Sequence, residues 1–167
     1  IALMYWYEGF EAMNRKDYDT ALSSFEKLIK LEPKNIRAYL LAAQNVMVGT
    51  KEFIKENALL SDRIPPPIKE KFTKAISWLK RAIELLQDEE QKTDLEMAYT
   101  NLSGCSVAIG LYDEAVEAAE KASAIDATSP ISFLNKGIAQ LKTGKYKEAI
   151  SSFQKYKELG GGDIDAD

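Results

Sequence analysis

The chain has 167 residues, of which 46% are hydrophobic and 29% are charged, a composition typical of a globular protein with its own core. The formal net charge is −4, which gives no general attraction for nucleic-acid phosphates, and no apolar stretch reaches the roughly 18 residues that indicate a membrane-spanning helix. Histidine is absent and Cys105 is the only cysteine, which excludes His-based catalytic triads, the usual zinc sites and a disulfide within one chain. We therefore expect no cofactor, no metal, no nucleic-acid partner and no direct membrane insertion.

Cys105 is expected to be a buried core residue and not a reactive thiol, because small residues surround it in a predicted helix. One unpaired cysteine fits a reducing compartment, so we expect a cytoplasmic protein. The first residue is Ile1 and not Met, and residues 1–7 read as the middle of a helical segment without the features of a secretory signal. We expect the chain to be a piece of a longer protein.

The first 35 residues predict two helices separated by the polar turn 14–17. Pro33 ends the second of them, because proline cannot continue the helical hydrogen-bond ladder. A third helix is expected from Ile36 to about Val48. An insertion then occupies residues 49–69, with apolar residues at helical spacing between 53 and 60 and three prolines at 65–67.

The prolines predict an extended corner followed by a helix that carries proline in its first turn. That helix is expected to continue past Gln87 and to be followed by a polar connector at residues 88–92. Thr93-x-x-Glu96 matches a capping box, and Ser129-Pro130 predicts an N-cap followed by proline at the first helical position. Residues 160–167, which begin with three glycines, are expected to form a flexible acidic tail.

One short pattern recurs four times along the chain, at residues 18–21, 72–75, 112–115 and 146–149: an aromatic residue, two mostly polar residues and an alanine. Ala115 and Ala149 are 34 residues apart, whereas Ala21 and Ala75 are 54 apart, which leaves 20 residues for the insertion. An aromatic residue also leads each preceding helix, and glycine follows the first and last of these after three residues. These positions are Tyr5 with Gly9, Tyr39, Tyr99, and Phe133 with Gly137.

With these residues and this period, the chain resembles the tetratricopeptide repeat (TPR) family over nearly its whole length. The resemblance implies an all-α fold, a right-handed TPR superhelix, or α-α solenoid, of helix-turn-helix repeats. We expect a single domain at residues 1–159. Its four repeats are expected at about 2–35, 36–87 with the insertion at about 49–69, 93–129 and 130–159.

In such a superhelix the first helix of each repeat lines a concave inner wall, and the resemblance places mostly apolar residues there. A contiguous apolar surface of this kind calls for a cover, either a helical or extended segment of another protein, or the insertion or upstream residues of the same protein. The candidate binding residues are Trp6, Tyr7, Phe10, Arg37, Leu40, Leu41, Gln44, Met97, Asn101, Leu134, Asn135 and Ile138.

TPR cochaperones that hold the acidic tails of heat-shock chaperones use lysine, arginine and asparagine at five inner positions. Only Asn101 matches this set in either of the two possible alignments, so no cationic pair can hold a carboxylate bidentately. The matching positions are Trp6, Phe10, Leu41, Met97 and Asn101 in one alignment, and Leu40, Gln44, Asn101, Ile131 and Asn135 in the other. We therefore expect a generic TPR protein outside the carboxylate-clamp subgroup.

The last two predicted repeats differ in charge. Residues 93–129 carry seven acidic residues against one lysine, and residues 130–159 carry six lysines against two acidic residues, so their net charges are −6 and +4. Either these are ordinary solvated faces, or they orient a partner or a second copy. The sequence also lacks a polar closing helix after the fourth repeat, which would leave Phe153 and Tyr156 to be covered by another chain.

No residues assemble a recognisable reactive centre, since pairs such as Glu8 and Glu11 arise routinely on helix surfaces. The sequence therefore predicts a non-catalytic scaffold for protein-protein interaction, with another protein or peptide as its partner. Two alternatives stay open: a structural module that forms homo-oligomers through uncapped ends, and the regulatory TPR domain of a larger multidomain protein.

Overall fold

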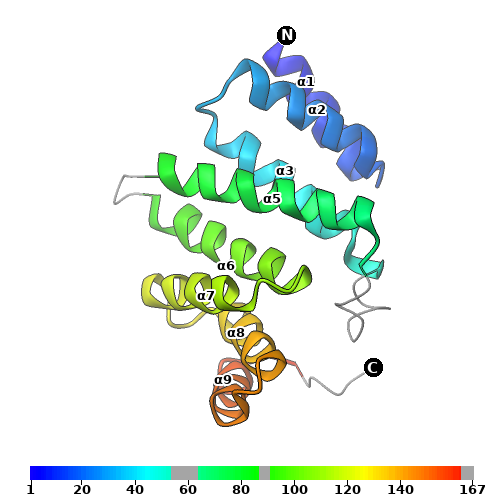
Figure 1. Cartoon of the computed structure of the whole chain (residues 1–167). Helices are drawn as coiled ribbons and strands as arrows, with labels where there is room; N and C mark the ends of the chain where they lie inside the picture. Colours follow the sequence, from blue (N-terminus) through cyan, green and yellow to red (C-terminus); the bar gives the residue numbers. More distant parts are fainter. Residues whose placement is uncertain (54–63, 87–90, 163–167) are drawn as a thin grey trace. The chain divides into compact units, whose positions relative to one another are not determined.

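The computed structural model describes residues 1–53, 64–86 and 91–162, and within these ranges the chain is helical with no strand (Figure 1). The all-α prediction is confirmed. The helices are α1 (Ala2–Asn14), α2 (Tyr18–Leu31), α3 (Ile36–Gly49), α5 (Pro66–Leu85), α6 (Lys92–Ala108), α7 (Tyr112–Ile125), α8 (Pro130–Lys142) and α9 (Tyr146–Glu158).

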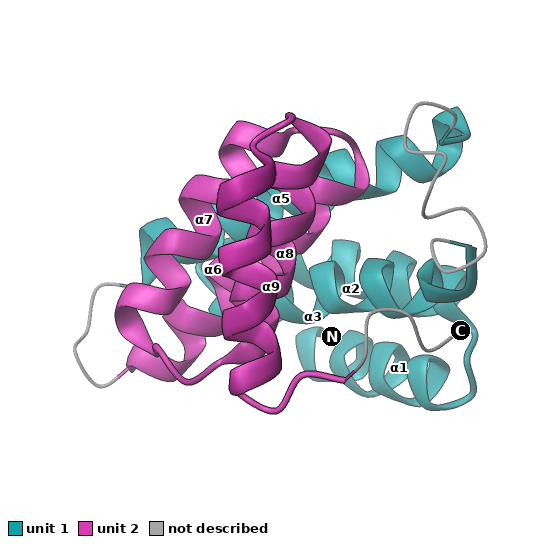
Figure 2. Cartoon of the chain, turned by 90° about the horizontal axis from the view of Figure 1, so that it is seen from below, with its two compact units in different colours: residues 1–87 teal, residues 88–167 magenta. Residues whose placement is uncertain are grey.

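The chain divides into two compact units, residues 1–87 and 88–167 (Figure 2). In the first unit α1 packs on α2, α2 on α3, and α3 on α5. In the second unit α6 packs on α7, α7 on α8 and α8 on α9, while α6 also lies beside α8. Each unit therefore contains two helix pairs, and the second helix of the first pair also contacts the first helix of the next pair.

A glycine in the first helix of a pair lets the second helix approach closely. A methyl group placed on Gly9 would lie 2.6 Å from the ring of Phe25, and one on Gly137 would lie 2.6 Å from the ring of Phe153. Such distances are far shorter than carbon–carbon contact allows. The phenylalanine ring thus occupies the space that a side chain would need, and this sets the separation of the two helices. Phe25 is fully buried.

The two middle helix pairs use smaller differences in size at the same positions. Where the outer pairs have Gly with Phe, α3 and α5 have Ala43 with Leu79, and α6 and α7 have Ser103 with Ala119; all four side chains are buried. As the residue in the first helix grows, the residue in the second helix shrinks. This is the complementarity of volume that close packing requires.

The same hydrogen-bonded turn joins the two helices of three pairs. At the end of α6 the N–H of Gly110 donates to the Val107 carbonyl and that of Leu111 to the Ser106 carbonyl, with distances of 3.1 and 2.8 Å. This is a Schellman motif, which needs a residue with positive φ. Gly110 and Gly144 supply it with φ values of 82° and 76°, whereas after α1 the residue is Lys16, with φ 62°.

The prolines act on the second repeat as the sequence predicts. Pro65 has an extended backbone (φ −55°, ψ 140°) and precedes α5, whose first turn contains Pro66. The helices on either side of the insertion, α3 and α5, pack on each other and so form the second helix pair. Residues 54–63 of the predicted insertion lie outside the described residues.

Helix starts differ from the predictions in detail. The predicted capping box at Thr93 is wrong, because α6 begins at Lys92 and the Glu96 carboxylate accepts a hydrogen bond from the Thr100 hydroxyl instead. Ser129 is the N-cap of α8 as predicted, but its side chain makes no capping bond. Side-chain caps occur at Asp17, which accepts from the Thr20 N–H, and at Asn35, which accepts from the Ala38 N–H.

The beginning of the predicted tail belongs to the fold. The N–H groups of Gly160 and Gly161 donate to the carbonyls of Lys157 and Tyr156, which forms another Schellman motif at the end of α9. A methyl group on Gly161 would lie 2.4 Å from the Tyr156 ring. Residues 163–167 lie outside the described part of the chain.

Gly9→Ala should lower the free energy of unfolding by about 1–3 kcal/mol, because the new methyl group meets the Phe25 ring. Adding Phe25→Leu should recover part of that loss, since the double variant reproduces the Ala43–Leu79 combination. Urea unfolding of the wild type, both single variants and the double variant measures this coupling. Strictly additive losses would mean that the ring does not set the helix separation.

Lys16→Gly should raise the free energy of unfolding by about 0.5–1 kcal/mol, because glycine adopts positive φ without the steric cost that lysine has there. Gly144→Lys is the matched reverse change in the equivalent turn, and it should destabilise by about 1 kcal/mol. Thermal and urea unfolding of both variants give the two signs. The idea fails if Lys16→Gly is destabilising.

Candidate interaction surfaces

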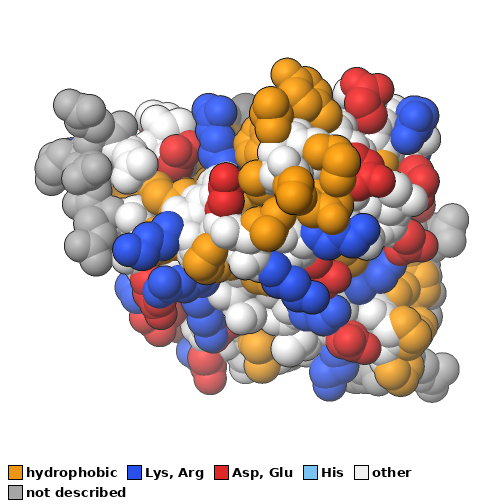
Figure 3. Space-filling model, turned by 90° about the horizontal axis from the view of Figure 1, so that it is seen from above, with side chains coloured by type: hydrophobic (Ala, Val, Ile, Leu, Met, Phe, Trp, Pro, Cys, Tyr) orange, Lys and Arg blue, Asp and Glu red, His pale blue; other side chains and the backbone are white. Residues whose placement is uncertain are grey.

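The outer side of α1 carries an unusual concentration of exposed hydrophobic side chains. Leu3 is 66% exposed, Tyr7 63% and Phe10 41%, and these three residues lie on one side of the helix because they are four and three positions apart. We call them the inner stripe of α1. Figure 3 views the molecule from the end where α1 lies, and hydrophobic side chains form a patch there.

The inner stripe of α1 has its counterpart in α3 at positions 34 residues further along. Arg37 and Gln44 are exposed, and Leu41 is half-buried where it packs against the core formed by Ala12, Ala21, Phe25 and Ala42. Leu40, predicted as a binding residue, is only 6% exposed and lies in the core. That assignment is corrected: the next residue, Leu41, faces the open side. Trp6 is half-buried.

The second unit brings its predicted residues together on α6 and α8, which lie side by side. Met97 is 38% exposed, while Asn101, Leu134 and Ile138 are half-buried. Asn135 donates from Nδ2 to the Thr100 carbonyl at 3.3 Å, so this amide links α8 to α6. The prediction that Asn135 offers its donors to a ligand therefore has a competing structural role.

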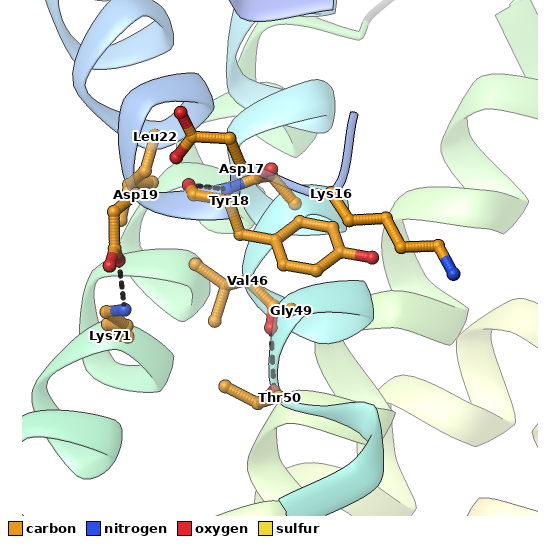
Figure 4. A pocket seen from close by; sticks show the side chains of 10 residues that line it. Lys16, Asp17, Tyr18, Asp19, Leu22, Val46, Gly49, Thr50 and Lys71 are labelled. Atoms are coloured by element: carbon orange, nitrogen blue, oxygen red, sulfur yellow. Dashed lines mark hydrogen bonds and ion pairs between the residues drawn. The ribbon is translucent and has the colours of Figure 1, made fainter. Parts of the chain in front are cut away.

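A hollow of about 240 Å³ lies at the junction of α2 and α3, and residues of the chain itself hold it in shape (Figure 4). Lys71 pairs with Asp19 at 2.8 Å, and the Thr50 hydroxyl donates to the Val46 carbonyl at 2.7 Å. Asn45 lines the hollow and donates to the Tyr18 carbonyl at 2.9 Å. These bonds serve the packing of α2, α3 and α5, and the hollow is smaller than most ligand pockets.

The described residues contain no group of acidic or cysteine side chains that could hold a metal ion. No helix among them is long and apolar enough to cross a membrane. Cys105 is fully buried, and burial raises the pKa of its thiol to about 12. The polar side chains of the surface form ordinary ion pairs, such as Lys121 with Glu117. The chemistry on offer is contact and not catalysis.

The sequence analysis missed the most exposed apolar residues of the second unit. It named Phe153 and Tyr156 as uncovered, but both are half-buried, and each meets a glycine, Gly137 and Gly161 respectively. The exposed residues of α9 are instead Tyr146 (64%) and Ile150 (58%). Their equivalence to Tyr18 and Leu22, which face the following helix, was the signal that could have identified them.

These features define a helical-repeat protein in which paired helices present open faces for contact. The tetratricopeptide repeat family matches the sequence in two places, residues 107–164 and residues 5–35. Together the two matches cover more than half of the chain and include both Gly–Phe pairs. The chain belongs to the tetratricopeptide repeat family.

Individual similarities agree with this assignment. A double mutant of MamA matches with a TM-score of 0.70 at 19% identity, over 95% of this chain and 74% of that one. The TPR2B domain of yeast Sti1, in its pHsp70 complex, matches with a TM-score of 0.53 at 22% identity, over 90% and 96% of the two chains. Human peptidyl-prolyl cis-trans isomerase FKBP4 is 24% identical over 152 residues, which are 85% of this chain and 30% of that protein. This chain spans about a third of the length of the curated relatives it matches.

Cys105 should not react with a water-soluble disulfide reagent in the folded protein, because the thiol is buried and its raised pKa leaves very little thiolate. Stoichiometric reaction should appear only when denaturant unfolds the chain. Following the release of thionitrobenzoate with time, in buffer and in denaturant, measures both states. Rapid reaction under native conditions would contradict the assignment of Cys105 to the core.

Proposed function

We propose that this protein is a non-catalytic interaction module that binds an apolar helical or extended segment of another protein along its inner stripes. The observation that carries the proposal is the exposure of Leu3, Tyr7 and Phe10 on one side of α1. Burying a large hydrophobic side chain is worth roughly 1.5–3 kcal/mol. Three such residues in line can therefore supply much of the affinity for a partner.

The chemistry of the inner stripe of α1 favours an apolar partner segment. Tyrosine and phenylalanine are common anchors at protein interfaces because their rings bury a large area with few rotatable bonds. Residues at spacings of four and three suit a partner helix that places its own apolar residues at the same spacing. The neighbouring stripe of α3 adds Arg37 and Gln44, which can bond to polar groups at the edge of such a segment.

The second unit offers a similar but less exposed surface. Met97 and Ile131 are 38% and 46% exposed, and Leu134 and Ile138 are half-buried beside them. Asn101 is half-buried and supplies an amide that can bond to the backbone of a bound segment. The surfaces of the two units thus share one design, in which apolar contact provides affinity and side-chain amides provide orientation.

The comparisons support binding of protein segments in general. Sti1 TPR2B is a TPR domain in a complex with pHsp70, and this chain shares its fold. The mode of binding is expected to differ from a carboxylate clamp, because the corresponding positions carry Trp6, Phe10, Leu41 and Met97 and not lysine or arginine. Affinity should therefore depend weakly on salt and strongly on apolar side chains.

Replacing Tyr7 and Phe10 together with serine should weaken binding of a selected peptide by about tenfold or more, since each anchor contributes of order 1 kcal/mol. The peptide is selected from a displayed random library on the immobilised chain, and its affinity is then measured in solution by fluorescence anisotropy. Both side chains are exposed, so the fold should persist.

The matched control replaces Tyr146 and Ile150, an equally exposed aromatic and aliphatic pair on α9, with serine. It should leave the affinity unchanged. A second test pair, Leu134→Ser with Ile138→Ser, asks whether the second unit contributes. Loss of binding in the α9 control but not in the α1 variant would mean that the inner stripe is not the binding surface.

A further inference from the structure

Two helices, α1 and α9, each keep a face that the other repeats use to pack on a neighbouring pair. We propose that copies of this chain associate head to tail, with α9 of one copy packing on α1 of the next. The proposed junction would copy the contacts that join α2 to α3 and α7 to α8 inside each unit. It uses surfaces other than the inner stripes.

The open face of α9 matches faces that are covered elsewhere. In α2, Tyr18 and Leu22 are half-buried because α3 packs over them, and a methyl group on Gly49 of α3 would lie 2.9 Å from Tyr18. In α7 the equivalent residues, Tyr112 and Val116, are also half-buried. The equivalents in α9 are Tyr146 and Ile150, which have the same kind of side chain and no described helix over them.

The open face of α1 lies where α3 and α8 receive the preceding helix. The receiving residues in α3 are Ala38, Ala42 and Asn45, all at most 1% exposed. In α8 the corresponding Ser132 and Ala139 are likewise buried. In α1 these positions hold Met4, which is 56% exposed, and the exposed Glu8 and Glu11. The face is therefore acidic where its counterparts are small and mostly uncharged.

Charge identifies α9 as the match for α1. At the α7–α8 junction an ion pair joins Glu120 of α7 to Lys136 of α8 at 2.9 Å. The position of Lys136 is taken in α1 by Glu8, so the sign on the receiving helix is reversed. Helix α1 contains no basic residue, and a second helix with lysines at its packing edge is the complementary surface.

Helix α9 provides those lysines. Lys147 occupies the position that Asp19 has in α2 and Asp113 has in α7, so the sign on the delivering helix is reversed too. Lys157 lies three turns along the same side as Tyr146 and adds a second positive group. Glu8 already accepts a bond from the Ser24 hydroxyl at 2.8 Å, which holds its carboxylate in place on α1. The two faces thus combine apolar contact with opposite charge.

A junction between two different faces does not close on itself in a pair of molecules. Each added copy leaves one free α1 face and one free α9 face, so assembly should continue with concentration. The wild-type chain should therefore show a weight-average mass in sedimentation velocity that rises above that of a monomer as concentration increases. High salt should reduce this mass because it screens the pairing of carboxylates with lysines.

Two variants test the junction directly. The tail variant carries Tyr146→Asp and Ile150→Asp on α9, and the head variant carries Glu8→Lys and Glu11→Lys on α1. Each should be monomeric alone, because each lacks one of the two faces. An equimolar mixture should give a species of twice the monomer mass that grows no further, because the two intact faces pair once.

Controls separate this proposal from peptide binding. The inner-stripe variant Tyr7→Ser with Phe10→Ser should assemble like the wild type while losing the selected peptide. Circular dichroism checks that each variant is folded, and Glu8→Gln with Glu11→Gln replaces the head variant if the lysines disturb α1. A wild type that stays monomeric at every concentration, variants that still polymerise alone, or a mixture that fails to pair would each overturn head-to-tail association.

Discussion

The close approach of paired helices, made possible by a missing side chain, is the constraint on which the rest of this structure depends. Gly9 and Gly137 leave space that the rings of Phe25 and Phe153 fill, and no bulkier residue fits without moving the helices apart. This contact fixes the rotation of each first helix about its axis. Once that rotation is fixed, every other residue of the helix is assigned to one of three sides.

Helix α1 illustrates the consequence for function. One side, with Gly9 and Ala12, is buried against α2. A second side carries Met4 with two carboxylates, and the third carries the exposed Leu3, Tyr7 and Phe10. A helix that is apolar on more than its buried side offers contact surfaces for other segments. The proposed binding and assembly roles use different sides of one helix and can be separated by mutation.

The sequence predicted the helices well because its strongest signals come from backbone chemistry. Proline at 65–67, glycine at 110 and 144, and the spacing of the alanines each restrict the chain locally. Prediction was weaker where only packing decides. Leu40 and Leu41 are indistinguishable by composition, yet one is buried and the other faces outward. Thr93 had a partner in sequence for a cap, but the helix begins one residue earlier.

The most direct test of the account is to map, residue by residue, where an apolar helical peptide contacts the chain. Titration of the labelled protein with the peptide should shift amide resonances along α1 and α3, or along α6 and α8, and leave those of α2, α5, α7 and α9 nearly unchanged. Such a pattern would place the ligand on the first helices of the pairs. Shifts concentrated on the second helices, or spread through the core around Phe25, would contradict the assignment of the inner stripes as the binding surface.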